Sequence, residues 1–368
     1  AGRGRARGRA ARAGAGAEDP GGFGRAGGPR EGWERFAREA REGFLAELEG
    51  PAPDAARCLL ALAAEHDAIS TRAVVPLPQA SFSGRVDKLV EGALREAAAA
   101  GGVDDPASVI CACVDHLYGA ARFRVAQADV EQASPYRTYM HNVLAQRQGT
   151  KEAVAAVLLS VLARAEARIG RPLEYRLEIP AEAAGRPTAV HAPGEAPEDL
   201  SRTTRALVLG CLRRLKRGYW PWAWVPGESS GFLVAAEAAL ESGDRFNQAM
   251  GFGVMQPEGR PFGNMQLAGL SCEALALLEG GHELRDSAVL LCHEKRVREA
   301  YEALKACVEA GGTVSPPLER GGLVGDMWGV DVGAGTGQAL GEMEHAAALR
   351  LAAHLEAQLA ELAWQSTP

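Results

Sequence analysis

The stretch from Ser134 to Ile179 decides the fold of this chain, and it reads SPYRTYMHNVLAQRQG, then TKEAVAAVLLSVLARAEARIG, then RPLEYRLEI. The first segment predicts a short polar helix that ends at Gly149. The second predicts a strongly apolar helix, with Thr150 as its N-cap and Gly170 as the glycine that ends it. In the third segment apolar and polar residues alternate, which is typical of a strand.

The rest of the chain extends this helical pattern in both directions. Apolar residues at spacings of three and four predict helices that begin near residues 33, 54, 86 and 105, ahead of the central stretch. Further helices are expected at 199–218, 229–242, 265–279, 283–310 and 342–364, and residues 188–191 predict a second short strand. The predicted fold class is therefore mainly α with a small antiparallel sheet, an α+β arrangement.

The composition of the 368 residues is that of a globular protein, with 47% apolar and 24% charged residues. Seven cysteines are scattered along the chain, most of them inside apolar helical patterns. We therefore expect reduced thiols in the core and a reducing compartment. The longest apolar run, at 153–163, is too short to cross a bilayer, so no transmembrane segment is expected.

Residues 1–30 form a basic arm on a chain whose net charge is −7. Five of its arginines lie in the Gly/Arg-rich beginning: Arg3, Arg5, Arg7, Arg9 and Arg12. Such a segment is typical of the remnant of an organelle transit peptide, or of an arm that contacts a partner, with a solvated tail as the simpler interpretation. Because the Gly/Arg repeats of this beginning contain no aromatic residues that could stack on bases, no nucleic-acid partner is expected.

A second candidate interface follows the helix predicted at 199–218. The sequence YWPWAW places Tyr219, Trp220, Trp222 and Trp224 within six residues, and Pro221 stops the helix, so these rings are expected on a loop. Two interpretations stay open. The rings are either buried against neighbouring helices or anchor an interface with another protein or with the membrane–water boundary.

Two motifs suggest cofactor or metal chemistry, and both signals are weak. The sequence VDVGAGTG at 330–337 resembles the Gly-rich motif of nucleotide-cofactor methyltransferases, but no strand precedes it and a single helix follows it. Cys111, Cys113, Asp115 and His116 lie close in sequence, yet on a helix they do not share one face. No metal and no cofactor are therefore expected.

The central stretch also resembles a known family. The run RTYMHNVLAQRQG, followed by the apolar helix, is similar to the SirB-type transglutaminase-like proteins of bacteria and plastids. The segments ARCLLALAAEHD from Ala56 and CLRRLKRGY from Cys211 resemble two further segments of that family, in the same order. The resemblance covers about 50–250 and implies a transglutaminase-like core at 31–200 with a repeat-like helical region at 201–310.

The resemblance also implies which residues catalysis would need. Family catalysis implies a cysteine at the start of the central helix, a histidine on a following strand and an aspartate beyond it. Here Thr150, Lys151 and Glu152 occupy the helix start, and no cysteine lies between residues 113 and 211. His191 is present on the second predicted strand but has no partner nucleophile. The chain is thus predicted to be a degenerate, non-catalytic member.

These observations predict a non-catalytic scaffold or accessory subunit of a larger organellar complex, with other protein subunits as partners. The basic arm, the aromatic loop and a Gly-rich extended segment at 311–341 are the expected contact segments, and a helix within 342–368 ends the chain. A plastid is favoured over a mitochondrion because the family occurs there, and peripheral membrane contact stays open. The alternative is a hydrolase or acyltransferase with a non-Cys active site around His191, or a hydrolase that uses His141.

Overall fold

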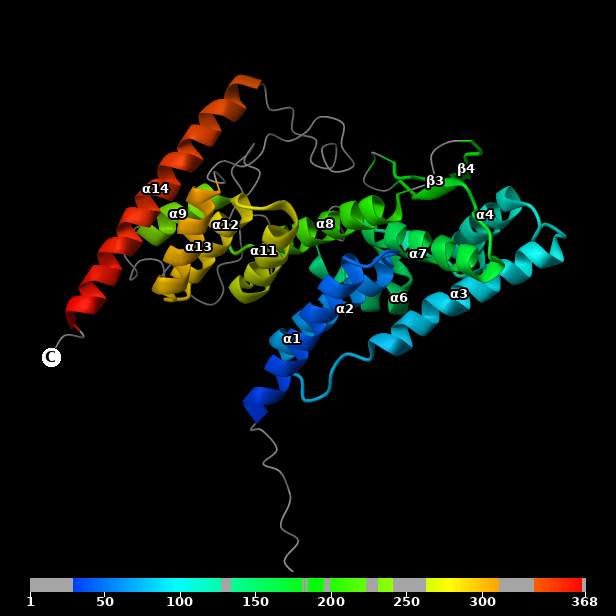
Figure 1. The fold of residues 1–368 in the computed structure, drawn as a ribbon, viewed down its shortest axis with the longest axis horizontal. Coiled ribbons are helices and arrows are strands. Elements are labelled where there is room, and N and C mark those ends of the chain that lie inside the picture. Colours follow the sequence, from blue (N-terminus) through cyan, green and yellow to red (C-terminus); the bar gives the residue numbers. More distant parts are fainter. Residues whose placement is uncertain are drawn as a thin grey trace, which may run out of the picture.

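The structure is a computed structural model that describes residues 29–126, 134–180, 182, 185–194, 199–222, 231–240, 263–310 and 334–365. Its helices are arranged along one long axis, with the N-terminal half at one end and the C-terminal half at the other (Figure 1). The predicted class is confirmed, because the protein is mainly helical and carries one two-stranded antiparallel sheet. In the described ranges, no helix is long and apolar enough to span a membrane.

The N-terminal half contains eight helices or helical turns and four short strands within the described residues, followed by a long bridging helix. In chain order the elements are α1 (Pro29–Leu48), α2 (Ala55–Thr71), α3 (Gln79–Ala99), α4 (Pro106–Asp115), the π-helical turn η1 (His116–Ala120), β1 (Arg124–Val125), the 3₁₀ turn η2 (Pro135–Arg137), α6 (Met140–Gln146), β2 (Gln148–Gly149), α7 (Lys151–Ile169), β3 (Tyr175–Glu178), β4 (Thr188–His191) and the bridging helix α8 (Leu200–Tyr219).

The regular elements of the C-terminal half are all helices within the described residues. Its elements are α9 (Phe232–Leu240), α11 (Met265–Glu279), α12 (His282–His293), α13 (Val297–Glu309) and α14 (Ala334–Gln365).

Helix α7 is the buried centre of the N-terminal half. Every residue from Lys151 to Leu162 is buried, and the helix contacts α2, α3, α4, α6 and α8. A helix that is covered on all sides needs apolar residues around its whole circumference, which the sequence of α7 supplies. The predicted ends are confirmed: Thr150 caps the first turn, and Gly170 ends the helix at a φ of 71°.

A polar cluster fixes the later turns of α7 against α2 and α3. Arg164 donates from Nε to Asp54 Oδ2 at 2.7 Å and lies 3.1 Å from Asp87 Oδ1. Ser160 donates to the other oxygen of Asp54 at 2.8 Å. Because Asp54 is also the N-cap of α2 and accepts from the Arg57 N–H, one carboxylate sets both the start of α2 and its position on α7.

Two small strand pairs cover this helical core. β3 and β4 pair antiparallel, with Tyr175 opposite His191 and Glu178 opposite Thr188, as the alternation predicts. β1 and β2 pair parallel over two residues each, and this pair was not predicted because two residues are too few to show a period. The β1–β2 pair holds the segment after η1 beside the turn that leads into α7.

Two predicted element boundaries in the C-terminal half are wrong. The single helix expected at 283–310 is two helices, α12 and α13, because Lys295 takes a left-handed φ of 64° between them. The final helix begins at Ala334 rather than near 342, inside the segment that we expected to be extended. Packing of α14 on α9 and α13 outweighs the low helix propensity of its early glycines. Residues 311–333 lie outside the described residues.

Helix α8 joins the two halves through two buried cations. Arg214 donates from Nε to Glu152 of α7 at 2.7 Å. Lys216 lies 2.6 Å from Glu283 and 2.5 Å from Asp286, both on α12. Residues two apart on an α-helix point about 200° apart, so these two side chains leave α8 on opposite sides. The N-terminal and C-terminal halves are thus tied to the same two turns of one helix.

The Arg214–Glu152 pair makes a direct prediction about stability. Both side chains are less than a tenth exposed, so Glu152→Gln leaves the Arg214 guanidinium buried without its counter-charge. We expect a loss of about 3–5 kcal/mol in the free energy of unfolding, measured by urea denaturation.

The matched control is Glu299→Gln, which removes the same charge from the exposed Arg296–Glu299 pair. Its cost should stay below about 1 kcal/mol, because solvent screens that pair. Equal costs for the two variants would show that the α7–α8 ion pair does not hold the halves together.

Candidate functional site

The start of α7 is where the family resemblance would place a nucleophile, and it is buried. Thr150 is 1% exposed, and its Oγ1 accepts from the Ala153 N–H at 3.4 Å. Its own N–H donates to the Arg137 carbonyl oxygen at 3.0 Å. The threonine therefore holds the helix start in place and presents no group to solvent.

The next two polar side chains of α7 are also engaged in structural contacts. Lys151 is 3% exposed and donates from Nζ to the Pro180 carbonyl oxygen at 3.1 Å, which ties the end of β3 to the helix start. Glu152 accepts from Arg214 of α8. The resemblance places a nucleophile at this point, whereas this chain uses the same residues to join α7 to its neighbours.

His191 lies at the other end of α7. It pairs with Tyr175 in the β3–β4 sheet, and its Nδ1 lies 3.2 Å from the carbonyl oxygen of Leu173, four residues after the end of the helix. A helix of 19 residues is about 28 Å long, so His191 and Thr150 are far apart. Within the described residues no Ser, Thr or Asp oxygen bonds His191. The arrangement therefore gives the hydrolase alternative no support.

His141 gives that alternative no support either. Its ring lies between Phe82 and Tyr139, with centroid distances of 5.9 and 5.7 Å, and its Nδ1 is buried. Burial lowers the pKa of this histidine, and an aromatic environment offers it no nucleophile to activate.

The aromatic loop residues are core residues wherever the structure describes them. Tyr219, Trp220 and Trp222 are 5%, 1% and 6% exposed, and Trp220 donates from Nε1 to the Gly231 carbonyl oxygen at 3.2 Å. The expectation that these three rings anchor a partner does not fit this burial, since no face of them is open. Pro221 follows the end of α8 as expected, and the Trp222 ring packs on the His293 ring of α12. Trp224 lies outside the described residues, as do Arg3, Arg5, Arg7, Arg9 and Arg12.

The structure does not bring the residues of the weak metal motif together, and it describes only part of the Gly-rich cofactor motif. Cys113 is buried, which raises its pKa to about 12, whereas Cys111 is exposed on another face of α4. His116 bonds Glu96 through Nδ1 at 2.7 Å, and its ring packs so closely on Gly92 that no β-carbon fits there. Of the segment 330–337, the structure describes only a helical backbone from residue 334.

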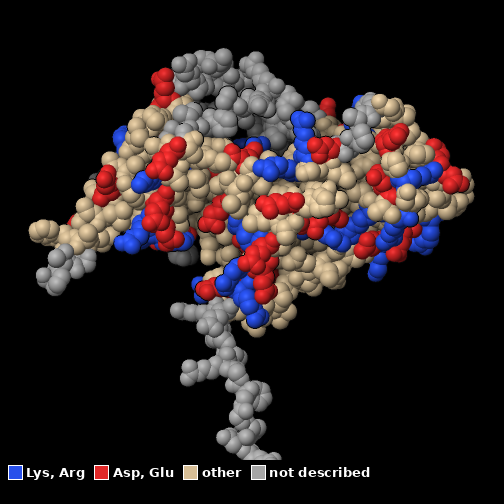
Figure 2. Space-filling view, in the orientation of Figure 1, with Lys and Arg blue, Asp and Glu red and all other residues tan. Residues whose placement is uncertain are grey.

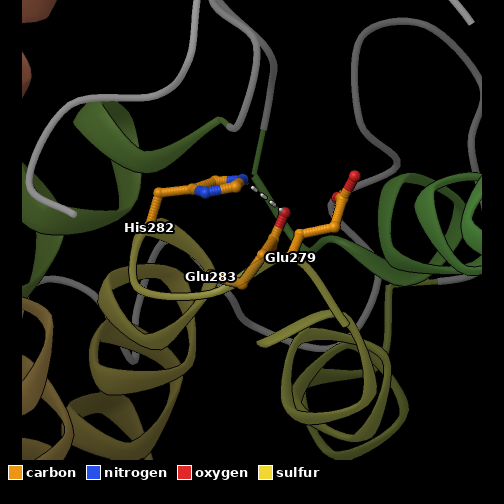
Figure 3. Close-up of side chains that lie close together, drawn as sticks. All are labelled: Glu279, His282 and Glu283. Carbon is orange, nitrogen blue, oxygen red and sulfur yellow. Dashed lines mark ion pairs between the residues drawn. The ribbon is translucent and has the colours of Figure 1, made fainter. Parts of the chain in front are cut away.

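A cluster that the sequence did not indicate lies where α11 meets α12 (Figure 3). Glu279, His282 and Glu283 bring potential metal ligands within 4.8 Å of one another, and His282 Nε2 lies 3.4 Å from Glu283 Oε1. Cations already neutralise both carboxylates, however: Arg213 pairs with Glu279 and Lys216 with Glu283. These residues fit a structural ion-pair group better than a metal site.

Lys216 is the centre of that group. Burial alone would lower its pKa, but Asp286 and Glu283 together raise the pKa above its ordinary value. Burial likewise raises the pKa of Glu283, yet the neighbouring Lys216 charge outweighs this and brings it down to about 2. The pair is therefore charged at every physiological pH, and it stabilises the contact between α8 and α12.

His66 is the most unusual buried titratable side chain of the N-terminal half. It is 1% exposed, its Nδ1 lies 2.8 Å from the Tyr139 hydroxyl, and its Nε2 has no hydrogen-bond partner among the described residues. Burial, with the nearby Arg41 charge, lowers its pKa to about 3. The sequence gives only a lone histidine on an apolar helix face, and the structure places it in the core.

The chain was compared with family models, with curated proteins and with solved structures, and none of them matches it. Fold and function therefore rest on the residues of this chain and their geometry.

His66 predicts a loss of stability in mild acid. Its pKa is about 3 in the folded protein and 6.5 when unfolded, so only the unfolded state takes up a proton between these values. Stability is complete above pH 6.5 and falls as the pH drops toward 3, with a contribution of about 2 kcal/mol between pH 7 and pH 5. Urea denaturation at both pH values measures this difference.

The variant His66→Gln isolates the effect, because glutamine does not titrate and can still bond the Tyr139 hydroxyl. Its loss of stability between pH 7 and pH 5 should be smaller than that of the wild type by about 2 kcal/mol. An identical pH dependence in both proteins would mean that His66 is protonated without unfolding.

Proposed function

We propose that this protein is a non-catalytic scaffold or accessory subunit that docks onto other proteins, and that its main docking surface is the outer face of α14. The observation that carries the proposal is a second apolar stripe on this helix. It consists of exposed residues at spacings of three and four: Met343, Ala346, Leu349, Ala353, Ala357, Ala360 and Trp364. Such a stripe occupies one side of an α-helix.

The opposite side of α14 is the one that packs on the protein. Its buried residues are Glu344, Ala347, Ala348, Leu351 and Leu355, and they lie against α9 and α13. The helix is thus apolar on two sides, although only one is covered. A helix on the outside of a water-soluble body normally keeps its second side polar, so an exposed apolar stripe is typical of an interaction surface.

The exposure of the large residues on the stripe supports this interpretation. Met343 is 56%, Leu349 45% and Trp364 84% exposed. Between them lie four alanines, and small residues let a second helix approach closely. Helix α14 forms one edge of the molecule and ends away from the body (Figure 1). The stripe therefore suits an apolar helix of a partner protein.

The closed start of α7 is in keeping with a function that is not catalytic. The polar side chains there join α7 to β3 and α8, and a rigid body of this kind suits a scaffold. An organellar complex, with a plastid favoured, stays part of the proposal on the strength of the basic arm and the family resemblance. The arm and the segment 311–333 are proposed as further contacts.

The proposal predicts a complex that depends on the α14 stripe. In an extract of the source organism, the tagged chain should run in a complex larger than its own 38.7 kDa and should carry a partner with it. The double variant Leu349→Ser/Trp364→Ser should lose that partner and keep its helical circular dichroism, because both side chains face away from the protein.

The matched control is Val74→Ser/Val75→Ser, which removes two exposed apolar side chains between α2 and α3. It should retain the partner. A wild-type chain that always runs alone would refute the scaffold function, whereas a stripe variant that keeps its partner would place the docking surface elsewhere. A complex that contains only copies of this chain would identify the stripe as a self-association surface.

A further inference from the structure

A cavity with an apolar floor and a cationic rim lies between α3, η1 and α6, beside the central stretch. Its volume is about 410 Å³, within the range of small-molecule sites. The floor is made by the buried side chains of Ala121, Phe123 and Leu144, with half-buried Leu89 beside them. Four apolar side chains gathered under one opening favour a ligand with an apolar body.

Three cations stand around the opening: Arg85 and Lys88 from α3, and Arg147 from the end of α6. Arg85 lies over the Phe82 ring, and among the described residues its hydrogen-bond partner is the Leu144 carbonyl oxygen, at 3.5 Å. In the described residues no carboxylate lies within 4 Å of any of the three. Their positive charges add together at the rim of an apolar cavity, where such a field attracts an anion.

The acidic residues of α3 have side-chain partners, whereas within the described residues Arg85 and Lys88 pair with no carboxylate. Asp87 and Glu91 lie on the same helix as the rim cations, but they pair with Arg164 and Arg168 of α7. Figure 2 shows positive and negative side chains mixed along the edge that α3 forms, so the helix is not basic as a whole. Two of the three acids of α3 are thus engaged by α7, and the third, Glu96, bonds His116 at the cavity wall, so within the described residues none of them pairs with Arg85 or Lys88.

The fourth polar side chain of the cavity is His116. Its Nδ1 bonds Glu96, so this carboxylate is already engaged, and the ring is held against Gly92. This histidine belongs to the π-helical turn η1, a type of distortion that is frequent at functional sites. The imidazole of His116 is therefore held in one position in the cavity wall. Its partner Glu96 does not neutralise the three rim cations, which can still bind an anion.

The backbone at Arg147 adds an independent observation. This residue ends α6 with a left-handed φ of 56°, a position where glycine or asparagine costs less. Its N–H donates to the Val143 carbonyl oxygen, and its carbonyl oxygen accepts from the Arg124 N–H at 2.9 Å, so the backbone is firmly placed. An arginine at such a position is strained, and strain of this kind gathers at functional sites.

We propose that this cavity binds an amphipathic anion, a molecule with one carboxylate or phosphate group on a short apolar chain or ring. The anionic group lies between Lys88, Arg147 and Arg85, and the apolar part lies on Phe123, Leu144 and Ala121. Burial of the apolar part on the cavity floor and pairing of the anionic group with the rim cations both favour binding. The site involves neither the start of α7 nor the stripe on α14.

Decanoate, below the concentration at which it forms micelles, is the probe that tests this proposal. Titration calorimetry on the full chain should show one site for decanoate. Decanol lacks the charge and acetate lacks the chain, so both should bind about tenfold more weakly or worse. Equal affinity for decanol and decanoate would overturn the proposal, because the cations would then contribute nothing.

Two variants test the two parts of the site separately. Lys88→Gln/Arg147→Gln should weaken decanoate binding by about tenfold or more and leave decanol unaffected. Ala145→Trp places a large ring at the opening from an exposed position on α6 and should abolish binding while all three cations remain. Unchanged binding in either variant would contradict the proposed site.

The matched control is Arg95→Gln/Arg124→Gln, which removes two exposed positive charges nearby that do not line the cavity. It should bind decanoate like the wild type, and an equal loss in this control would reduce the effect to general electrostatic attraction. Vesicles with anionic lipid distinguish the source of the ligand. Binding to vesicles without binding of monomeric decanoate would replace the cavity with a membrane surface and overturn the proposal.

Discussion

The two buried cations of α8 are the constraint on which the rest of the structure depends. A charge taken out of water is costly unless a counter-charge and hydrogen bonds replace the lost hydration. Arg214 meets this condition only if α7 presents Glu152, and Lys216 only if α12 presents Glu283 and Asp286. Since the two cations leave α8 on opposite sides, each half must dock on α8 in one register. The ion pairs thus specify the relative placement of halves whose apolar faces alone would tolerate small shifts.

A buried ion pair also fixes α14 on α12. Arg285 is fully buried, and it pairs with Asp286 on its own helix and with Glu344 of α14 at 3.0 Å. Its guanidinium also lies 4.2 Å from the centre of the Phe232 ring of α9. A buried arginine between two carboxylates and an aromatic face has few alternative arrangements. The position of Glu344 therefore fixes the rotation of α14 and with it the direction in which the outer stripe faces.

Local sequence signals predicted the elements that depend on local chemistry. Thr150, Gly170 and the apolar run between them describe α7 correctly, because caps and apolar residues act within one helix. Features that need a partner from elsewhere in the chain were missed. The break at Lys295 interrupts a regular helical pattern, and the Lys216 network joins residues about 70 positions apart. The YWPWAW motif could not tell burial from exposure, since an aromatic ring suits a core and an interface equally.

The start of α7, where the resemblance places a nucleophile, differs from the end of α6 in how much of its surface is covered. At the start of α7, packing on every side leaves no room for a substrate, and each polar group has a structural partner. A few residues earlier the chain is still at the surface, where α6 ends in the strained turn at Arg147 and lies across from α3. A short helix with one free side can line a cavity, whereas a central helix that is covered all round cannot. The second half of this stretch thus forms the centre of the core, whereas the first half packs one side on the core and lines the proposed cavity at the end of α6.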